Sequence, residues 1–260
     1  MEMDKEEELL RKRFLELSNQ AFQRGIVMYT DFLNLNELNI LHTTPKNLLA
    51  VPFRTFGGYA FAERQMAAFL PDAFYLYTDE DEILEKYPMS VIQISPLNGK
   101  FAEDLGHRDY LGALLNLGIE RSKLGDILIQ EKMAYLFACD GMADFICNEL
   151  TRVRHTTVQA VRIEREEFDY EPRYEEIRGT VASVRLDSLL SLAWNSSRSK
   201  MAPLIEEARV YVNGKLITSN GYHVRENDII SVRGMGRFRY MGMISETKKG
   251  RCYVLVYKYI

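Results

Sequence analysis

Cations and small hydroxyl side chains alternate at a predicted helix start near the C-terminal end of the chain, in Ser197, Arg198, Ser199 and Lys200. Ser197 is a favourable N-cap residue, and the unpaired N–H groups of a helix start bind phosphate groups. Arg198 and Lys200 would strengthen that contact through their charge. A helix start with a structural role alone needs the cap residue but not two cations beside it. We therefore predict that Ser197, Arg198 and Lys200 contact a phosphate-bearing ligand.

Another cation stands at the start of the preceding predicted helix. Arg185 and Asp187 flank Leu186 there, and an acidic side chain near a helix N-terminus is favoured by the helix dipole. Arg185 could contact phosphate, or it could only pair with Asp187. The sequence supports both alternatives equally, and Arg185 is kept as a candidate contact.

Four further cations follow in the same segment, and we add them to the candidate contacts: Lys215, Arg233, Arg237 and Arg239. Lys215 comes directly after Asn213-Gly214, a strong signal for a two-residue hairpin turn, since both central positions of that turn take positive φ. The three arginines fall close together and are separated by Gly234 and Gly236.

The charge of the chain is strongly polarised. Residues 179–260 hold 13 Lys and Arg against 6 Asp and Glu, a net of +7, whereas residues 1–178 carry a net of −11. A basic region neutralises phosphates and releases counterions, and an acidic remainder repels nucleic acid and favours one docking orientation. A chance excess of cations on a solvated surface is the alternative. Because charge and motif agree on one segment, the sequence favours a nucleic-acid ligand.

Cysteine and histidine spacing argues against several other classes. The three cysteines are scattered without a CxxC pair, which is not a disulfide framework, and the four histidines lack metal-ligand spacing. The start of the chain is charged, and no apolar run approaches the length of a membrane span. We expect a reduced, cytoplasmic protein without membrane insertion, bound metal or cofactor.

The elements before the basic segment predict an α+β fold. Helices are expected over 4–24, 30–41 and 60–70, and a strand over 73–79. Residues 91–164 then predict the order β-α-β-β-α-β, which is a ferredoxin-like unit. The strands of this unit are expected at 91–97, 125–130, 134–139 and 156–164, and the helices at 107–119 and 143–150.

RNA-recognition motifs share this topology and stack bases on aromatic residues of the two central strands. Residues 91–97 have no aromatic side chain, and only Tyr135 and Phe137 appear on the third strand. These two residues share one face, because they stand two positions apart in a strand. We favour the interpretation that they pack a core.

Residues 164–178 are dense in charge and contain Pro172. They predict an exposed connector or an extended edge strand, and the most favourable domain boundary. We expect an N-terminal α/β region over 1–72, a ferredoxin-like (RRM-like) domain over 73–165 and a C-terminal domain over 179–260. The C-terminal domain should end in an added β-hairpin that turns at 247–250.

The order of features in residues 185–238 resembles the RNA-binding domain named after ribosomal protein S-four. It has the Arg-Leu-Asp opening, two short helices, the Ser-Arg-Ser-Lys corner and the strand with the Asn-Gly turn. Asn227-Asp228 stands where that domain usually has Gly-Asp, and Asn tolerates the left-handed conformation. The resemblance implies that residues 179–260 bind structured RNA.

The chain as a whole resembles the YlmH family of bacterial RNA-binding proteins. Besides the S-four-type domain, the resemblance rests on Gly57-Gly58-Tyr59 with Ala62-Glu63-Arg64, and on the run GHRDYLGALLNLGIERSKLGDIL at 106–128. The family is associated with a bacterial cell-division gene neighbourhood. It is also implicated in ribosome quality control on obstructed large ribosomal subunits, where the S-four-type domain holds ribosomal RNA and tRNA. The resemblance therefore implies a non-catalytic binder of rRNA and tRNA.

An RNA-modifying enzyme is the alternative, with the middle domain as its catalytic part. His107-Arg108-Asp109 is similar to the catalytic loop of pseudouridine synthases, in which Asp109 would be the nucleophile. The Leu between Arg and Asp and the downstream Thr-Ser-Gly of those enzymes are missing, and they usually carry the RNA-binding domain first. We favour a helix-start cluster that orients the middle domain.

Overall fold

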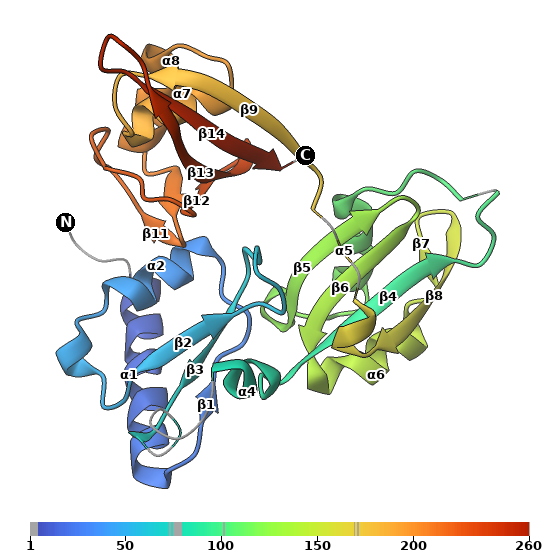
Figure 1. Ribbon diagram of the computed structural model, residues 1–260. Helices are drawn as coiled ribbons and strands as arrows, with labels where there is room; N and C mark the ends of the chain where they lie inside the picture. Colours follow the sequence, from blue (N-terminus) through green and yellow to red (C-terminus); the bar gives the residue numbers. More distant parts are fainter. Residues whose placement is uncertain are drawn as a thin grey trace. The chain divides into compact units, whose positions relative to one another are not determined.

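The computed structural model describes residues 5–72, 74, 80–100, 102–168, 170 and 172–259. The chain divides into two compact units, Met1–Tyr170 and Glu171–Ile260. Helices combine with three antiparallel sheets (Figure 1), which confirms the predicted α+β class. Except for Phe74, which is helical, the strand predicted over 73–79 lies outside the described residues, and the division into three regions stays a prediction. No helix in the described ranges is long and apolar enough to cross a membrane.

The N-terminal part of the first unit packs helices against a small antiparallel sheet of order β1-β3-β2. Its elements in chain order are α1 (Lys5–Arg24), β1 (Met28–Tyr29), α2 (Leu35–Thr43), η1 (Lys46–Leu48), β2 (Phe53–Phe56) and β3 (Met66–Phe69). Phe14, Leu17 and Ala21 of α1 are buried in its core together with Phe69. The apolar stripe predicted for this helix is thus its packing face.

The helix predicted over 60–70 is wrong, since β3 is a buried strand. Met66 and Ala68 belong to one hydrophobic core, whereas Ala67 and Phe69 belong to another. Strand side chains point alternately to opposite faces, so this continuous apolar run covers two cores at once. Tertiary burial therefore overrides the helical propensity of the segment.

The helix predicted over 30–41 begins later, at Leu35. Asn34 is its N-cap, and its side-chain oxygen accepts hydrogen bonds from the backbone N–H groups of Asn36 (2.9 Å) and Glu37 (3.0 Å). Thr30 instead donates its N–H to the carbonyl of Ala67 at 2.9 Å. An extended segment beside the sheet thus precedes the helix.

The middle part of the first unit has the predicted ferredoxin-like topology. Its elements are α4 (Glu80–Glu85), β4 (Met89–Pro96), α5 (His107–Asn116), η2 (Arg121–Lys123), β5 (Leu124–Gln130), β6 (Met133–Cys139), α6 (Asp140–Glu149), β7 (Arg152–Val153), β8 (Thr156–Ile163) and η3 (Arg165–Glu167). The sheet order is β5-β6-β4-β8-β7, with every neighbouring pair antiparallel. Tyr110 and Leu114 of α5 and Ile146 of α6 are buried against one face of this sheet.

The other face of this sheet is also buried. Tyr135 and Phe137 of β6 pack in a core with Phe32 from the N-terminal part. Tyr59 stacks on Phe137 with ring centroids 5.4 Å apart, and Phe168 makes a T-shaped contact with the same ring, with centroids 5.1 Å apart. The interpretation of Tyr135 and Phe137 as core residues is confirmed. Base stacking on this face is therefore excluded in the described structure.

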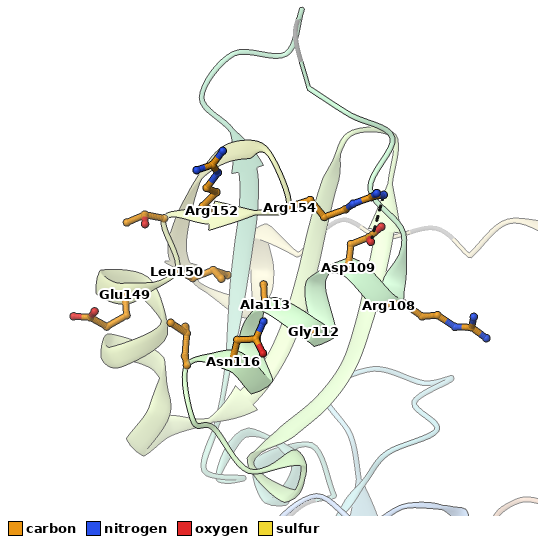
Figure 2. Close-up of a pocket in the computed structure, with 11 residues that line it drawn as sticks. Arg108, Asp109, Gly112, Ala113, Asn116, Glu149, Leu150, Arg152 and Arg154 are labelled. Atoms are coloured by element: carbon orange, nitrogen blue, oxygen red, sulfur yellow. Dashed lines mark ion pairs between the residues drawn. The ribbon is translucent and has the colours of Figure 1, made fainter.

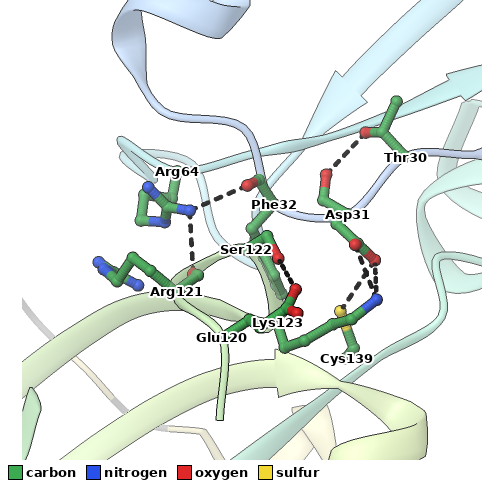
Figure 3. Close-up of polar contacts among 9 residues, drawn as sticks. All are labelled: Thr30, Asp31, Phe32, Arg64, Glu120, Arg121, Ser122, Lys123 and Cys139. Atoms are coloured by element: carbon green, nitrogen blue, oxygen red, sulfur yellow. Dashed lines mark hydrogen bonds and ion pairs between the residues drawn. The ribbon is translucent and has the colours of Figure 1, made fainter. Parts of the chain in front are cut away.

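Polar contacts join the N-terminal and middle parts of the first unit (Figure 3). The guanidinium of Arg64 donates hydrogen bonds to the carbonyls of Leu124 (2.8 Å), Phe32 (2.9 Å) and Arg121 (3.1 Å). Lys123 Nζ lies 2.7 Å from Asp31 Oδ2. The Ala62-Glu63-Arg64 block and the 106–128 run are thus partners in one interface.

Asp126 and Gly58 complete this interface. The Asp126 carboxylate accepts hydrogen bonds from the hydroxyl of Tyr59 (2.8 Å) and from the backbone N–H groups of Glu63 (2.8 Å) and Arg64 (3.1 Å). Gly58 has φ +98°, and a Cβ there would lie 2.2 Å from the ring of Phe137. Only glycine fits this approach of backbone to ring.

The second unit packs two short helices on one face of a sheet of order β11-β10-β12-β13-β14-β9. Its elements are β9 (Tyr174–Val181), α7 (Leu186–Ala193), α8 (Arg198–Glu206), β10 (Val210–Val212), β11 (Lys215–Leu216), β12 (Ile229–Val232), β13 (Gly236–Glu246) and β14 (Cys252–Tyr259). The C-terminal hairpin is confirmed as β13 and β14. The edge-strand alternative for 164–178 holds only for its last residues, since β9 begins at Tyr174 and pairs with β14, whereas Arg165–Glu167 form η3.

The two turns that the sequence predicts in this unit have the expected backbone. Asn213 and Gly214 have φ of 48° and 77°, and Asn227 has φ of 69°. Asn213 also stabilises the turn at Asn227. Its Nδ2 donates to Asp228 Oδ1 at 2.8 Å, and its Oδ1 accepts from the N–H of Ile229 at 2.9 Å.

Candidate nucleic-acid interface

The start of α7 combines an exposed arginine with a buried carboxylate. The Asp187 side chain is 8% exposed, and Arg185 Nε lies 3.3 Å from its Oδ1. The Arg185 side chain nevertheless remains 42% exposed. The pairing alternative for Arg185 is therefore present in the structure, and the partly exposed side chain keeps Arg185 a candidate phosphate contact.

Arg198, the first residue of α8, binds the same carboxylate. Its Nε donates to Asp187 Oδ2 at 3.1 Å, and its Nη2 donates to the same oxygen. The Arg198 side chain is 49% exposed. Besides being an exposed cation, Arg198 therefore ties the start of α8 to the start of α7. One buried carboxylate thus holds two cations at adjacent helix starts.

Ser197 occupies the predicted N-cap position of α8, but its side chain makes no capping hydrogen bond. Its hydroxyl lies 2.9 Å from the hydroxyl of Ser199, which competes with the helix N–H groups for it. Lys200 is exposed and has no polar partner in the described part of the chain. We call Arg185, Ser197, Arg198 and Lys200 the helix-start cluster; it places three cations at two helix starts, and two of these cations bind the Asp187 carboxylate.

Arg237 and Arg239 lie on the opposite face of the sheet from the helices. Phe238, between them, is completely buried in the core that α7 and α8 cover. Since strand side chains alternate, both arginines project from the other face. The Arg239 guanidinium donates to Asn227 Oδ1 at 2.8 Å, and the Arg237 guanidinium lies 5.3 Å from the ring centroid of Tyr259.

Tyrosines accompany these arginines, which the sequence reasoning missed. Tyr257 pairs with Arg239 across the strands and stacks on Tyr174 with ring centroids 4.1 Å apart. An arginine and tyrosine surface suits unpaired bases as well as phosphates. The alternation of residue types along β14 was visible in the sequence, but the register of this strand against β13 and β9 was not.

Lys215 and Arg233 stand at opposite ends of the strands. The register of β10 on β12 pairs Val212 with Ile230 and Val210 with Val232. Lys215 therefore follows the turn at one end of the β10–β12 pair, and Arg233 follows the last residue of β12 at the other end. The eight predicted contacts thus form the helix-start cluster, a pair on the sheet face and two separate positions. Arg209, whose Nη2 donates to the carbonyl of Arg233 at 3.0 Å, is a further cation beside them.

Asp109 in the middle part has the geometry of a capping residue. Its Oδ2 accepts a hydrogen bond from the N–H of Gly106 at 2.8 Å, and its Oδ1 lies 3.7 Å from Arg154 Nη1. The first contact caps the start of α5, where a carboxylate is also stabilised by the helix dipole. This arrangement agrees with the helix-start interpretation of His107-Arg108-Asp109.

Family models match three successive segments of the chain. Residues 6–72 match "YlmH, N-terminal", residues 84–167 match "Putative RNA-binding domain in YlmH", and residues 184–230 match "S4 domain". The order of the three matches is the order that the resemblance implied.

A curated relative is similar over almost the whole chain. The "Ribosome-associated protein quality control protein P2" of Bacillus subtilis (strain 168) is 30% identical over 252 residues, which cover 95% of this chain and 93% of the relative. Among solved structures, "Cell division protein ylmH from Streptococcus pneumoniae" is 22% identical with a TM-score of 0.50, covering 65% of this chain and 98% of that chain. At this identity the solved structure supports the fold alone.

Proposed function

The chain belongs to the YlmH family, and we propose that it is a non-catalytic protein that binds structured ribosomal RNA and tRNA on obstructed large ribosomal subunits in the cytoplasm. Its RNA-binding domains and the name of the Bacillus relative support an RNA-binding role at the ribosome. The choice of rRNA, tRNA and obstructed subunits rests on the family resemblance.

The helix-start cluster is the observation that carries this proposal. Two helices begin side by side, and three cations surround their starts. Asp187 occupies much of the guanidinium of Arg198, so Lys200, the exposed part of Arg185 and the free N–H groups of α8 are the groups left for phosphate. Contacts of this kind recognise the backbone of a folded RNA and are sensitive to salt.

A crosslinking map of the protein's RNA contacts in cells tests this function. We expect crosslinks to large-subunit rRNA and to tRNA, concentrated on residues of the second unit. The matched control is the Lys200→Glu variant, which reverses the charge of an exposed side chain. A footprint scattered over mRNAs, unchanged by Lys200→Glu, would contradict the proposal.

The enzyme alternative has its own test. We expect that no modified nucleoside in rRNA or tRNA depends on Asp109, because this carboxylate caps a helix and pairs with Arg154. Mass spectrometry of nucleosides from cells lacking the protein, complemented with the natural chain or the Asp109→Asn variant, measures this. A nucleoside that is lost without the protein and is restored by the natural chain alone would establish an RNA-modifying enzyme.

A further inference from the structure

The middle part of the first unit cannot use the sheet face that RNA-recognition motifs use. Phe137 is fully buried, and Tyr135 is 5% exposed. Tyr59 and Phe168 cover the Phe137 ring from the face and the edge. Any nucleic acid that this part contacts must therefore meet another surface.

A cavity of about 550 Å³ opens on the helical side of this part (Figure 2). It is bounded by α5, by the end of α6 and by the short strand β7 with its turn. This volume lies in the range of small-ligand sites and could hold a nucleotide unit. The charged residues that line it are Arg108, Asp109, Glu149, Arg152 and Arg154.

The cavity floor contains a helix glycine that packing does not require. Gly112 lies in the middle of α5, and a Cβ built there meets no heavy atom within 4 Å. Glycine in a helix interior costs about 1 kcal/mol relative to alanine. Neither a close contact nor an unusual φ accounts for Gly112, but the missing side chain keeps the cavity open next to Ala113 and Asn116.

The cationic groups at the cavity are only partly neutralised. Arg154 lies 3.7 Å from Asp109, whose carboxylate also caps the helix. Arg108 and Arg152 are exposed and have no polar partner within the described ranges. In Figure 2, the Arg152 side chain points upward and the Arg154 side chain extends to the other side toward Asp109, whereas the Arg108 guanidinium extends away from the centre. In a region with a large acidic excess, Arg152 and Arg154 at one cavity favour an anionic ligand.

We propose that this cavity is a second RNA site, in which a phosphodiester segment binds to Arg152 and Arg154 while its sugar lies over Gly112. The proposal rests on the RNA-binding function proposed above and adds a contact outside the S-four-type domain. Arginine suits this role because its guanidinium fork matches two phosphate oxygens. The Asn116 amide supplies both a donor and an acceptor for a ribose hydroxyl.

Two variants of the full chain distinguish the effect of the cavity's positive charge on RNA binding from the effect of its open volume. Arg152→Ala combined with Arg154→Gly removes two cations, and glycine suits the positive φ of 52° at position 154. Its matched control is Lys12→Ala with Arg13→Ala, which removes two exposed cations from α1. Gly112→Gln fills the cavity without changing charge. Its control is Gly141→Gln, a helix glycine in α6 that also faces open space and does not line the cavity.

The measurement is the affinity of each chain for a large-subunit rRNA fragment over a salt series. We expect the arginine variant to bind about tenfold more weakly and its log–log salt slope to fall by about 1 to 2. Gly112→Gln should also weaken binding, with a smaller change of slope, and both controls should match the natural chain. Thermal unfolding of each variant checks the fold.

The outcomes distinguish the two proposals. If the natural chain does not bind rRNA, the proposed function fails. If it binds and both cavity variants keep its affinity and slope, the second site alone is overturned. Cavity variants that bind RNA normally but no longer sediment with ribosomes would assign the cavity to a protein contact and would also overturn it.

Discussion

Replacing Arg198 and Lys200 separately should distinguish folding from RNA contact within the helix-start cluster. Arg198→Ala leaves the Asp187 carboxylate, which is 8% exposed, with Arg185 as its remaining cation. Breaking a buried ion pair costs about 3–5 kcal/mol. Arg198 is half-exposed and Arg185 stays in place, so we expect a loss of about 1–2 kcal/mol in the free energy of unfolding of the second unit. Its Tm should fall by about 4–16 °C.

Lys200→Ala should have the opposite profile. The side chain is exposed, so the free energy of unfolding should change by no more than about 0.5 kcal/mol. If Lys200 contacts a phosphate, RNA affinity should fall for every sequence tested and the log–log salt slope should decrease by about 1. Lys248→Ala is the matched control, since Lys248 is an exposed lysine of the same unit in the turn of the hairpin.

Thermal unfolding and fluorescence anisotropy with a labelled rRNA fragment measure both quantities on the full chain. A salt slope that Lys200→Ala leaves unchanged would refute the phosphate contact. An unchanged Tm in Arg198→Ala would refute the structural pairing with Asp187. A loss of RNA binding in Lys248→Ala equal to that in Lys200→Ala would show that overall charge, and not the cluster, controls the affinity.

Three further predictions concern the first unit. Arg64→Ala removes three hydrogen bonds to backbone carbonyls, of which the Leu124 and Arg121 carbonyls keep other donors, and should cost about 2–4 kcal/mol in denaturant unfolding, with RNA affinity unchanged; a loss below about 0.5 kcal/mol would contradict the interface role. Gly58→Ala places a Cβ 2.2 Å from the Phe137 ring and should destabilise the same unit by more than about 2 kcal/mol, whereas an unchanged midpoint would show that the ring moves freely. Burial raises the pKa of the Cys139 thiol from 9.0 to about 12, so the folded state favours the neutral thiol. The contribution of this thiol to the free energy of unfolding is therefore complete below pH 9 and is lost as pH rises toward 12. Alkylation mapped by mass spectrometry at pH 8 should therefore be much slower at Cys139 than in the unfolded chain, and equal rates would contradict this.

Local pattern was sufficient for much of the architecture. Hydrophobic periodicity predicted α1 and the β-α-β-β-α-β order of the middle part, because amphipathic spacing reports which side of an element is buried. Turn chemistry located the left-handed positions at Asn213, Gly214 and Asn227, since few residue types adopt them at low cost. The resemblance of residues 185–238 to the S-four-type domain likewise depends on residues that are close in sequence.

Periodicity alone did not identify what covers each buried face. The β3 segment resembles a helix locally, but it is a strand because its side chains divide between two cores that other segments build. In the same way, the sequence favoured a core role for Tyr135 and Phe137 but left base stacking on this face open. Only the placement of Phe32, Tyr59 and Phe168 over them closes that face.

The positions of the candidate RNA contacts also depend on tertiary structure. The sequence by itself determined which residues are cationic and that they gather in the second unit. It did not determine that Arg198 shares Asp187 with Arg185, nor that Arg237 and Arg239 face away from α7 and α8. Charge and hydrogen-bonding type belong to each residue, whereas pairing and the face of a sheet are properties of contacts between distant segments. Strand register and helix packing set those contacts, and they minimise the free energy of the whole unit instead of any local segment.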